Sequence, residues 1–213
     1  MVKRSHRIGT LTVSLATVCG LVACSGAETT PTAGNETGTE ISTQTSGTAA
    51  TTQTRSAEGA VTVTDAAGRT LQFDELPDRI VLAEGRAAYA TALLQDNPLD
   101  NVVAYGQDLE KAAGAFREKL FEMQPEAKDM PEIGMIQKGD VTVENLLAQD
   151  PDVVVMTLDQ KKAAEESGFL ADMDSAGLQY AFIDFRQDPL EHTAASMSLL
   201  GGLLDKDDRA AKF

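Results

Sequence analysis

The 213-residue sequence lacks tryptophan and has only two cysteines and two histidines. Protein sites for zinc or manganese usually gather several histidines, and a serine or cysteine nucleophile usually needs a histidine as its base. His6 lies in an N-terminal segment that we expect to be removed, so His192 alone remains for such work. It falls in a leucine- and alanine-rich helical pattern, which favours a surface or boundary position. No P-loop and no glycine fingerprint after the first predicted strand are present. The sequence therefore argues against a multi-histidine metal site and against an enzyme.

The N-terminal segment has an apolar stretch, but not one typical of a membrane-spanning helix. Three basic residues precede the run Ile8–Ala23, and Gly9, Ser14 and Gly20 interrupt it. A short basic region followed by such a run is the layout of a secretory signal. We therefore expect residues 1–23 to be a signal peptide.

The end of this segment, LVAC at residues 21–24, resembles the lipobox of bacterial lipoproteins. The resemblance implies cleavage before Cys24 and lipid on its thiol; a chance cysteine in an ordinary signal is the alternative. Cys19 would leave with the signal, so no disulfide is expected. Two or more acyl chains anchor a protein stably. We therefore expect the protein on the extracytoplasmic face of the cell membrane, attached through lipid and without other covalent cofactors.

Basic residues are scarce as well. The predicted signal contains three of the 18 lysines and arginines and no acidic residue, so 15 basic residues face 33 acidic ones, a net charge of −18. Such a surface repels nucleic acid and anionic lipid headgroups.

Residues 24–58 are rich in Thr, Ser and Gly and almost free of large apolar side chains, which predicts a disordered tether.

Beyond the tether, strand and helix patterns alternate. The segment Val61–Phe73 alternates polar and apolar residues around a turn with Gly68, which predicts a β-hairpin. Strands are predicted at Arg79–Ala83, Val102–Tyr105, Val153–Met156 and Tyr180–Asp184; helices are predicted at Arg86–Gln95, Leu109–Met123, Val143–Leu147, within Gln160–Asp174, and from Pro189 to about Leu200. This order predicts an α/β fold: a Rossmann-like, doubly wound, mostly parallel sheet preceded by the hairpin.

Two helix boundaries carry specific predictions. Thr142 is expected to cap the short helix before the strand at 153–156, and Asp150-Pro151 to end it. Gly201-Gly202 is expected to stop the helix that starts at Pro189, and Asp205–Asp208 to begin another.

The residues from Thr64 onward resemble a known family. The motifs TDAAGRTLQFDELPDRIV, VVAYG, PEIGMI, VTVENLLAQDPDVVVM and SLLGGLLDKDDRAAKF occur in the order found in the substrate-binding lipoproteins of ABC importers for iron-siderophore, haem and cobalamin-type ligands. That family has two Rossmann-like lobes joined by one long helix, with the ligand in the cleft between them. The resemblance implies that residues 59–204 form the N-terminal ligand-binding lobe and 205–213 the start of the inter-lobe helix, with the second lobe absent from this sequence.

Ligands of open α/β sheets bind beyond the carboxyl ends of the strands. Those junctions are Glu84-Gly85-Arg86 with Tyr89, Tyr105-Gly106-Gln107, Met135-Ile136-Gln137, Thr157-Leu158-Asp159 and Phe185-Arg186-Gln187. The predicted ligand-binding residues are Arg86, Tyr89, Tyr105, Gln137 and Arg186. The guanidinium groups of Arg86 and Arg186 suit the carboxylate or catecholate oxygens of a ferric chelate, with surface ion pairs as the alternative. For Tyr89 and Tyr105 the alternative to stacking on a ligand is a place in the core.

Glu144 has a different predicted role. In the family that the sequence resembles, a glutamate on the exposed end of each lobe pairs with arginines of the permease, and Glu144 matches the one in the first lobe. The alternative is a glutamate in the first turn of a helix, favoured only by the helix dipole.

Three hypotheses follow. The first is a lipid-anchored solute-binding component that delivers an iron chelate to an ABC permease. The second is a membrane-tethered single-lobe interaction or sensor domain without a transport role. The third, an extracytoplasmic α/β enzyme, has the least support because histidine and cysteine are so scarce.

Overall fold

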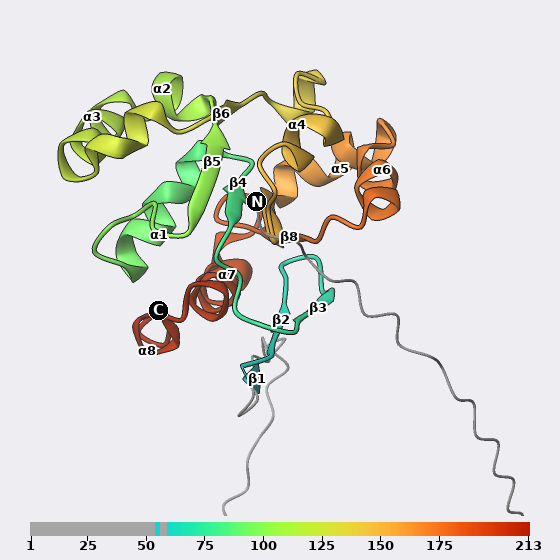
Figure 1. Ribbon diagram of the computed structural model, residues 1–213. Helices are drawn as coiled ribbons and strands as arrows, with labels where there is room; N and C mark the ends of the chain where they lie inside the picture. Colours follow the sequence, from blue (N-terminus) through green and yellow to red (C-terminus); the bar gives the residue numbers. More distant parts are fainter. Residues whose placement is uncertain (1–53, 56–58) are drawn as a thin grey trace, which may run out of the picture. The chain divides into compact units, whose positions relative to one another are not determined.

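A computed structural model describes residues 54–55 and 59–213 (Figure 1). The predicted signal peptide, Cys24 and nearly all of the predicted tether lie outside the described residues. The strands are β1 (Thr54–Arg55), β2 (Val61–Thr64), β3 (Thr70–Phe73), β4 (Ile80–Leu82), β5 (Val102–Gly106), β6 (Glu132–Ile133), β7 (Val153–Thr157) and β8 (Tyr180–Ile183). The α-helices are α1 (Ala88–Leu94), α2 (Asp108–Ala112), α3 (Gly114–Met123), α4 (Val143–Leu147), α5 (Leu158–Glu166), α6 (Phe169–Ala176), α7 (Pro189–Leu204) and α8 (Asp207–Ala210). Three short 3-10 helices join them: η1 (Gly85–Ala87), η2 (Pro125–Asp129) and η3 (Ile136–Lys138).

The central sheet has five parallel strands in the order β6-β5-β4-β7-β8. The chain starts in the middle with β4, winds outward to β6, returns to place β7 beside β4, and continues to β8. In the register, Leu82 lies between Tyr105 and Val155. The order reverses between β4 and β7, so the predicted doubly wound α/β fold is confirmed.

The two faces of this sheet are covered by different helices. In β4, Ile80 and Leu82 pack into a core with α1, α2, α3 and α7, whereas Val81 packs into a second core with α4, α5 and α6. Figure 1 shows α4, α5 and α6 together on the other side of the sheet from α1. All residues of β4 and β7 are buried, as expected for strands covered on both faces.

The predicted hairpin is confirmed. Strands β2 and β3 pair antiparallel, with Val61 opposite Phe73. Gly68 takes a positive φ of +76° in the turn, where a side chain would be strained. The apolar side chains of the hairpin join the core on the α7 side of the sheet. The structure differs at the end of the predicted tether, because Thr54–Arg55 form strand β1 beside β2. The free edge of β2 offers the backbone groups for this pairing, which side-chain composition does not reveal.

The hairpin turn is fastened to strand β8 by an ion pair. Both the Nε and Nη2 atoms of Arg69 donate to the Asp65 carboxylate, at 3.0 and 2.8 Å. Asp65 also accepts from the backbone N–H of Phe182, and Arg69 donates to the carbonyl oxygen of Tyr180. The guanidinium of Arg69 lies over the rings of Tyr180 and Phe182, 4.2 and 4.9 Å from their centroids. This Asp65–Arg69 cluster therefore binds the hairpin turn to backbone groups of β8, the edge strand of the central sheet.

The predicted helix-strand unit at 142–156 is confirmed. Thr142 Oγ1 accepts from the backbone N–H of Asn145 at 3.3 Å, and Asn145 Oδ1 accepts in return from the N–H of Thr142 at 3.2 Å. This capping box starts α4. Beyond its end, Asp150 has a positive φ of 48° directly before Pro151, and the chain then enters β7.

Two predicted helices have different boundaries. The helix predicted at Leu109–Met123 is broken at Ala113, whose φ and ψ of −148° and 40° are not helical. A glycine inside a helix costs about 1 kcal/mol relative to alanine, and the break moves Gly114 to the first position of α3. The prediction of one continuous helix is therefore wrong.

The predicted stop at Gly201-Gly202 is also wrong. Helix α7 begins at Pro189 as predicted but continues to Leu204. Asp205, with a φ of 58°, is its C-cap residue. A Cβ atom on Gly201 would lie 2.5 Å from the Cβ of Ala210 in α8. The glycine therefore permits close packing of α7 and α8, and it does not end the helix. Helix α8 begins in the predicted segment, and its identity as the start of an inter-lobe helix stays a prediction.

In the part of the chain that the structure describes, no helix combines the length and hydropathy needed to cross a membrane.

Candidate functional site

A cavity of about 410 Å³ opens at the carboxyl ends of β4, β7 and β8. The strand order reverses there, since β4 leads into α1 on one face of the sheet and β7 leads into α5 on the other. Open α/β sheets commonly bind ligands at such a point. The cavity is lined by Glu84, Arg86, Ala87, Tyr89, Ala90, Leu93, Thr157, Ile183, Asp184, Phe185, Arg186, Thr193, Met197 and Phe213.

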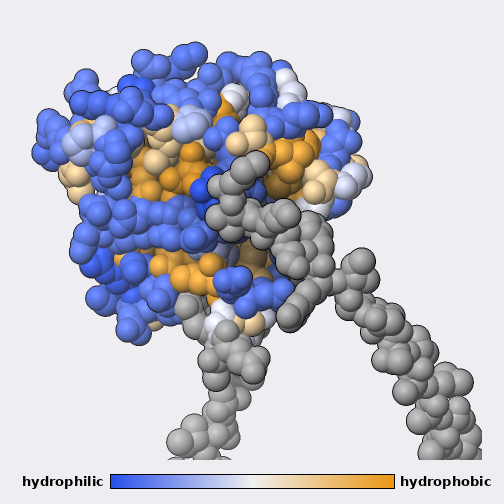
Figure 2. Space-filling view, in the orientation of Figure 1, coloured by the Kyte–Doolittle hydropathy of each residue, from blue (hydrophilic) through white to orange (hydrophobic). Residues whose placement is uncertain are grey.

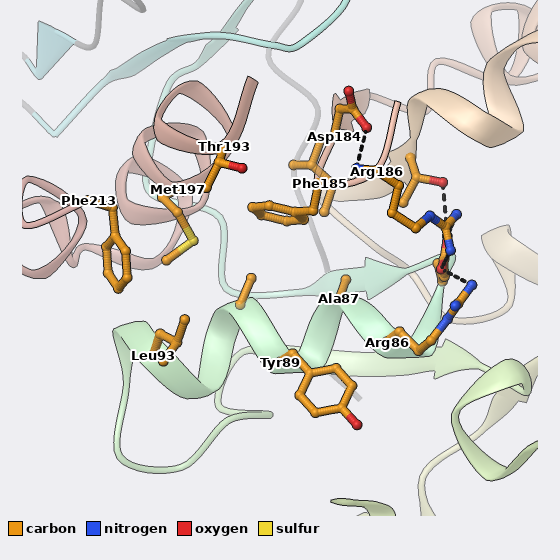
Figure 3. Close-up of a pocket in the computed structure, with 14 residues that line it drawn as sticks. Arg86, Ala87, Tyr89, Leu93, Asp184, Phe185, Arg186, Thr193, Met197 and Phe213 are labelled. Carbon is orange, nitrogen blue, oxygen red and sulfur yellow. Dashed lines mark hydrogen bonds and ion pairs between the residues drawn. The ribbon is translucent and has the colours of Figure 1, made fainter. Parts of the chain in front are cut away.

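Most of the cavity wall is apolar. Figure 3 shows the Phe185 ring and Met197 between helix α1 and helix α7, with Leu93 and Phe213 near the far end of α1. Leu93 and Phe213 are 56% and 53% exposed, so apolar surface remains open to solvent at this place. Figure 2 shows hydrophobic areas interrupting an otherwise mostly hydrophilic face of the molecule. Such a wall favours a ligand that presents hydrocarbon or aromatic surface.

The polar end of the cavity is built on one buried carboxylate. Glu84, two residues after the end of β4, is only 6% exposed. Arg186 Nη1 and Nη2 bond its two oxygens at 2.7 and 3.0 Å, and Arg86 Nη2 lies 2.5 Å from Oε1. Thr157 Oγ1 donates to Oε2 at 2.9 Å. Both predicted arginines therefore meet at the same glutamate.

Two further carboxylates complete what we call the Glu84 cluster, comprising Glu84, Arg86, Asp108, Asp159 and Arg186. Asp108 accepts from Arg86 Nε at 3.1 Å, and Asp159 accepts from Arg186 Nη2. Burial by itself lowers the pKa of Arg186, but Glu84 and Asp159 outweigh it, so the pKa lies above the usual arginine value. Arg186 is thus positively charged at any physiological pH.

A second buried carboxylate shapes the loop after β8. Asp184 Oδ1 accepts from the backbone N–H of Arg186 and Gln187, and Oδ2 accepts from that of Asp188. His192 Nδ1 lies 2.8 Å from the same Oδ2. Burial alone would raise the pKa of Asp184, but these hydrogen bonds lower it to about 2. The loop that carries Phe185 and Arg186 is therefore held by an ionised carboxylate.

Glycines allow the loops after β4 and β5 to touch beside the cavity. A Cβ atom on Gly85 would collide with the carbonyl oxygen of Gly106, and one on Gly106 would lie 2.7 Å from the nitrogen of Gly85. Asp108 Oδ1 accepts from the N–H of Gly85 at 2.6 Å. This contact fixes the start of η1 and with it the position of Arg86.

The structure separates the five predicted ligand-binding residues into two groups. Arg86, Arg186 and Tyr89 line the cavity. The Tyr89 side chain is not in the core; it is 47% exposed and stacks on Phe116 with ring centroids 4.2 Å apart. Figure 3 shows it turned away from Phe185. Contact of these residues with a ligand stays a prediction.

Tyr105 and Gln137 do not line the cavity. Tyr105 is 1% exposed, and its hydroxyl lies 3.4 Å from the carbonyl oxygen of Ala127 and 3.3 Å from Glu132 Oε1. Burial and the nearby Glu132 raise its pKa. Gln137 is exposed in η3. Tyr105 takes the core position that was its alternative, because it lies inside strand β5 and not after it.

Four further residues line the cavity that were not among the predicted ligand-binding residues: Glu84 and Phe185, which belong to predicted strand-end junctions, and Asp184 and Met197. Glu84 and Asp184 share a signal in the sequence, since each is an acidic residue one or two positions after a buried strand. Met197 gives no such signal, because an apolar residue within a helix looks like any other core position.

No group of three or more potential metal-ligating side chains is found among residues 54–55 and 59–213.

Glu144 lies outside this cavity. It occupies the first turn of α4, beside a separate hollow of about 650 Å³ between α4 and α6 that exposed Leu147 also lines. Its own backbone N–H and the Thr142 side chain hold the pKa of Glu144 below the usual value. Its carboxylate is therefore exposed and ionised, with docking to a permease still a prediction.

No protein-family model and no curated protein sequence matches the chain. Solved structures do. The TroA-like periplasmic binding protein FepB from Veillonella parvula is 28% identical with a TM-score of 0.63, over 71% of this chain and 44% of that protein. A periplasmic solute-binding protein from Veillonella parvula DSM 2008 is 20% identical with a TM-score of 0.56, over 72% of this chain and 44% of that protein. Holo-ViuP is 16% identical with a TM-score of 0.51, over 71% and 46%.

This chain thus spans less than half the length of the proteins that it matches. The two Veillonella proteins are described as periplasmic binding proteins. The described residues have the α/β fold of one lobe of a TroA-like periplasmic binding protein.

Proposed function

We propose that this protein is the lipid-anchored solute-binding component of an ABC importer, which binds a ferric-siderophore-type chelate at the cavity and delivers it to a membrane permease. The observation that carries the proposal is the position of the cavity, at the carboxyl ends of β4, β7 and β8 where the strand order reverses. The similarity to a periplasmic solute-binding protein supports it.

The chemistry of the cavity suits such a cargo. A siderophore chelate wraps its metal in an organic shell with both hydrocarbon surface and oxygen acceptors. Phe185, Met197 and Leu93 offer apolar contacts, and the partly exposed guanidinium groups of Arg86 and Arg186 offer N–H donors. The chelator supplies the ligands of the metal, so the protein needs no metal-ligating cluster of its own.

One lobe covers one side of a ligand. Tight sites for small molecules usually enclose some 70–90% of the ligand surface. The similar proteins are more than twice as long as the part that this chain matches. We therefore expect the chain by itself to bind weakly, and we propose that a second lobe provides the opposite wall of the site.

The binding test uses the chain's own fluorescence, since it has three tyrosines and no tryptophan. Gallium(III) siderophores, haem and cobalamin are titrated into the full chain, and calorimetry provides an independent readout. A saturable response is expected with at least one of them, and Phe185→Ala should weaken it by about tenfold or more through the lost apolar contact. The matched variant Phe121→Ala, on α3 outside the cavity, should bind normally. A chain that responds to none of these compounds would favour the alternative, an interaction or sensor domain without a transport role.

The delivery step is tested in cells that depend on the protein for iron. Glu144→Ala should leave ligand affinity unchanged and abolish uptake, because its exposed carboxylate is proposed to pair with arginines of the permease. Glu166→Ala, another exposed glutamate on α5, is the control and should support normal uptake. Normal uptake with Glu144→Ala would contradict the proposal that Glu144 docks the protein to the permease.

The lipid anchor is tested by fractionation. Cys24→Ala should release the protein from the membrane, while Cys19→Ala should leave it attached. Attachment that survives Cys24→Ala would refute the anchor.

A further inference from the structure

We infer that Glu84 makes this site selective for chelates without net negative charge. The inference rests on the proposed function and specifies it. Arginines at a siderophore site suggest, at first sight, the recognition of anionic catecholate or carboxylate oxygens. The structure points the other way, because acidic side chains already hold both arginines.

Each guanidinium has two acidic partners. Arg86 is bonded to Glu84 at 2.5 Å and to Asp108 at 3.1 Å. Arg186 is bonded to Glu84 at 2.7 Å and also to Asp159. Within the described residues, these two arginines are the only basic residues that line the cavity. An anionic ligand therefore meets no uncompensated positive charge there.

Glu84 is not free to move aside for a ligand. Its side chain is only 8% exposed, and both of its oxygens are bonded to Arg186. Thr157 Oγ1 donates to Oε2 as well. A ligand that displaced Glu84 would leave a buried carboxylate without its partners, which is strongly unfavourable.

The charge around the polar end is negative. The two arginines face four carboxylates, those of Glu84, Asp108, Asp159 and Asp184. The sum is −2 with His192 neutral and −1 with His192 protonated. The low-dielectric apolar wall strengthens the repulsion of a polyanion.

Uncharged oxygen acceptors remain compatible with this site. The side chains of Arg86 and Arg186 are 37% and 39% exposed, and a guanidinium has five N–H donors. Carbonyl-type oxygens of an uncharged chelate can accept from these donors while the ion pairs stay intact. A ferric trihydroxamate, neutral overall and linked by hydrocarbon spacers, has this chemistry; a ferric tricatecholate, with three negative charges, does not.

The test compares the gallium(III) complexes of a trihydroxamate and a tricatecholate on the full chain, by calorimetry and tyrosine fluorescence. Gallium(III) has the charge of iron(III), so the two complexes differ in the charge of the chelator. The wild-type chain should bind the trihydroxamate at least about tenfold more tightly. Glu84→Gln frees positive charge and should increase tricatecholate affinity, relative to trihydroxamate affinity, by about tenfold or more. The gain should shrink with added salt.

A second variant serves if Glu84→Gln does not fold. Asp159→Asn removes the negative charge of one partner of Arg186, at a side chain that is 32% exposed, and it should shift selectivity in the same direction by a smaller factor. Asp172→Asn on α6, an exposed aspartate outside the cavity, makes the same change in net charge and should leave selectivity unchanged.

The outcomes separate the inference from the proposed function. Tighter binding of the tricatecholate by the wild-type chain, or unchanged selectivity in both Glu84→Gln and Asp159→Asn, would overturn the inference while the binding function stands. Absence of any chelate binding would overturn both.

Discussion

The Asp65–Arg69 cluster and the Glu84 cluster both lie at strand ends, and they differ in how many arginines share one carboxylate. In the hairpin turn, Asp65 is fully buried and pairs with one arginine, Arg69, whose guanidinium also lies over the rings of β8. In the cavity, buried Glu84 is shared by Arg86 and Arg186, and both guanidinium groups stay partly exposed.

The difference indicates different roles. The Asp65–Arg69 cluster satisfies its groups internally and joins the hairpin to the sheet, which is a structural task. The Glu84 cluster lies at the carboxyl ends of three strands and faces an apolar cavity. We therefore expect mutations in the first cluster to lower stability, and mutations in the second to change binding more than stability.

The largest expected effect is that of Asp65→Ala. It removes a carboxylate with a fully buried side chain that accepts from Arg69 and from the N–H of Phe182. Each buried donor that loses its acceptor commonly lowers the free energy of unfolding by about 1–3 kcal/mol, and Asp65 is the acceptor of several hydrogen bonds. Urea unfolding measures this, with the exposed Asp172→Ala as the control. A loss below about 1 kcal/mol would contradict the structural role.

Gly85→Ala should come next. The new Cβ collides with the carbonyl oxygen of Gly106, and backbone cannot yield as a flexible side chain does. Overpacking of this kind typically lowers the free energy of unfolding by about 1–3 kcal/mol. Gly114→Ala is the matched control, because nothing lies within 4 Å of its added Cβ and alanine favours a helix. Equal stability of the two variants would argue against the close approach of the two loops.

Asp184 should make stability depend on pH. Its pKa is about 2 in the folded chain against an ordinary value of 3.8, so its ionisation favours folding by about 2 kcal/mol above pH 3.8. This contribution is lost as the pH falls from 3.8 toward 2. The difference in unfolding free energy between the wild type and Asp184→Asn, measured from pH 6 to pH 2, should shrink over that interval. A constant difference would refute the role assigned to Asp184.

Arg186→Ala should have the smallest effect on stability. It should lower the free energy of unfolding less than Arg69→Ala does. Glu84 keeps Arg86 as a partner when Arg186 is removed, whereas Asp65 loses the one ion-pair partner found for it in the described residues. Arg69→Ala should therefore lower the denaturation midpoint more and leave chelate binding unchanged, and Arg186→Ala should alter chelate binding. The reverse pattern would exchange the roles of the two clusters.

The sequence predicts the framework of the fold because burial on both faces leaves long apolar signals. The run Val153–Met156 and the alternation around Gly68 are sufficient for a central strand and a hairpin. Strand β6, only two residues long with Glu132 exposed, gives no comparable pattern. The glycine pair at 201–202 misleads because its packing partner, Ala210, lies in the next helix.

The site is less predictable because its contacts join distant parts of the chain. Arg186 reaches Glu84 across 102 residues, through the parallel register of β4, β7 and β8. The residue types at strand ends identify both arginines as candidates, but not their shared partner. Tyr105 shows a different difficulty. It was a candidate because it stands at the end of a predicted strand, but β5 continues to Gly106 and the Tyr105 side chain is buried.

The central claim is that the cavity binds a chelate. A single tryptophan substitution, used as a fluorescence reporter, tests it most directly. The chain has no tryptophan, so Leu93→Trp places one reporter at the cavity wall, and Leu190→Trp places one at a fully exposed position that does not line it. Gallium(III) trihydroxamate should change the Leu93→Trp emission saturably and leave the Leu190→Trp emission unchanged. No change in the Leu93→Trp emission, or equal changes in both, would contradict binding at this cavity.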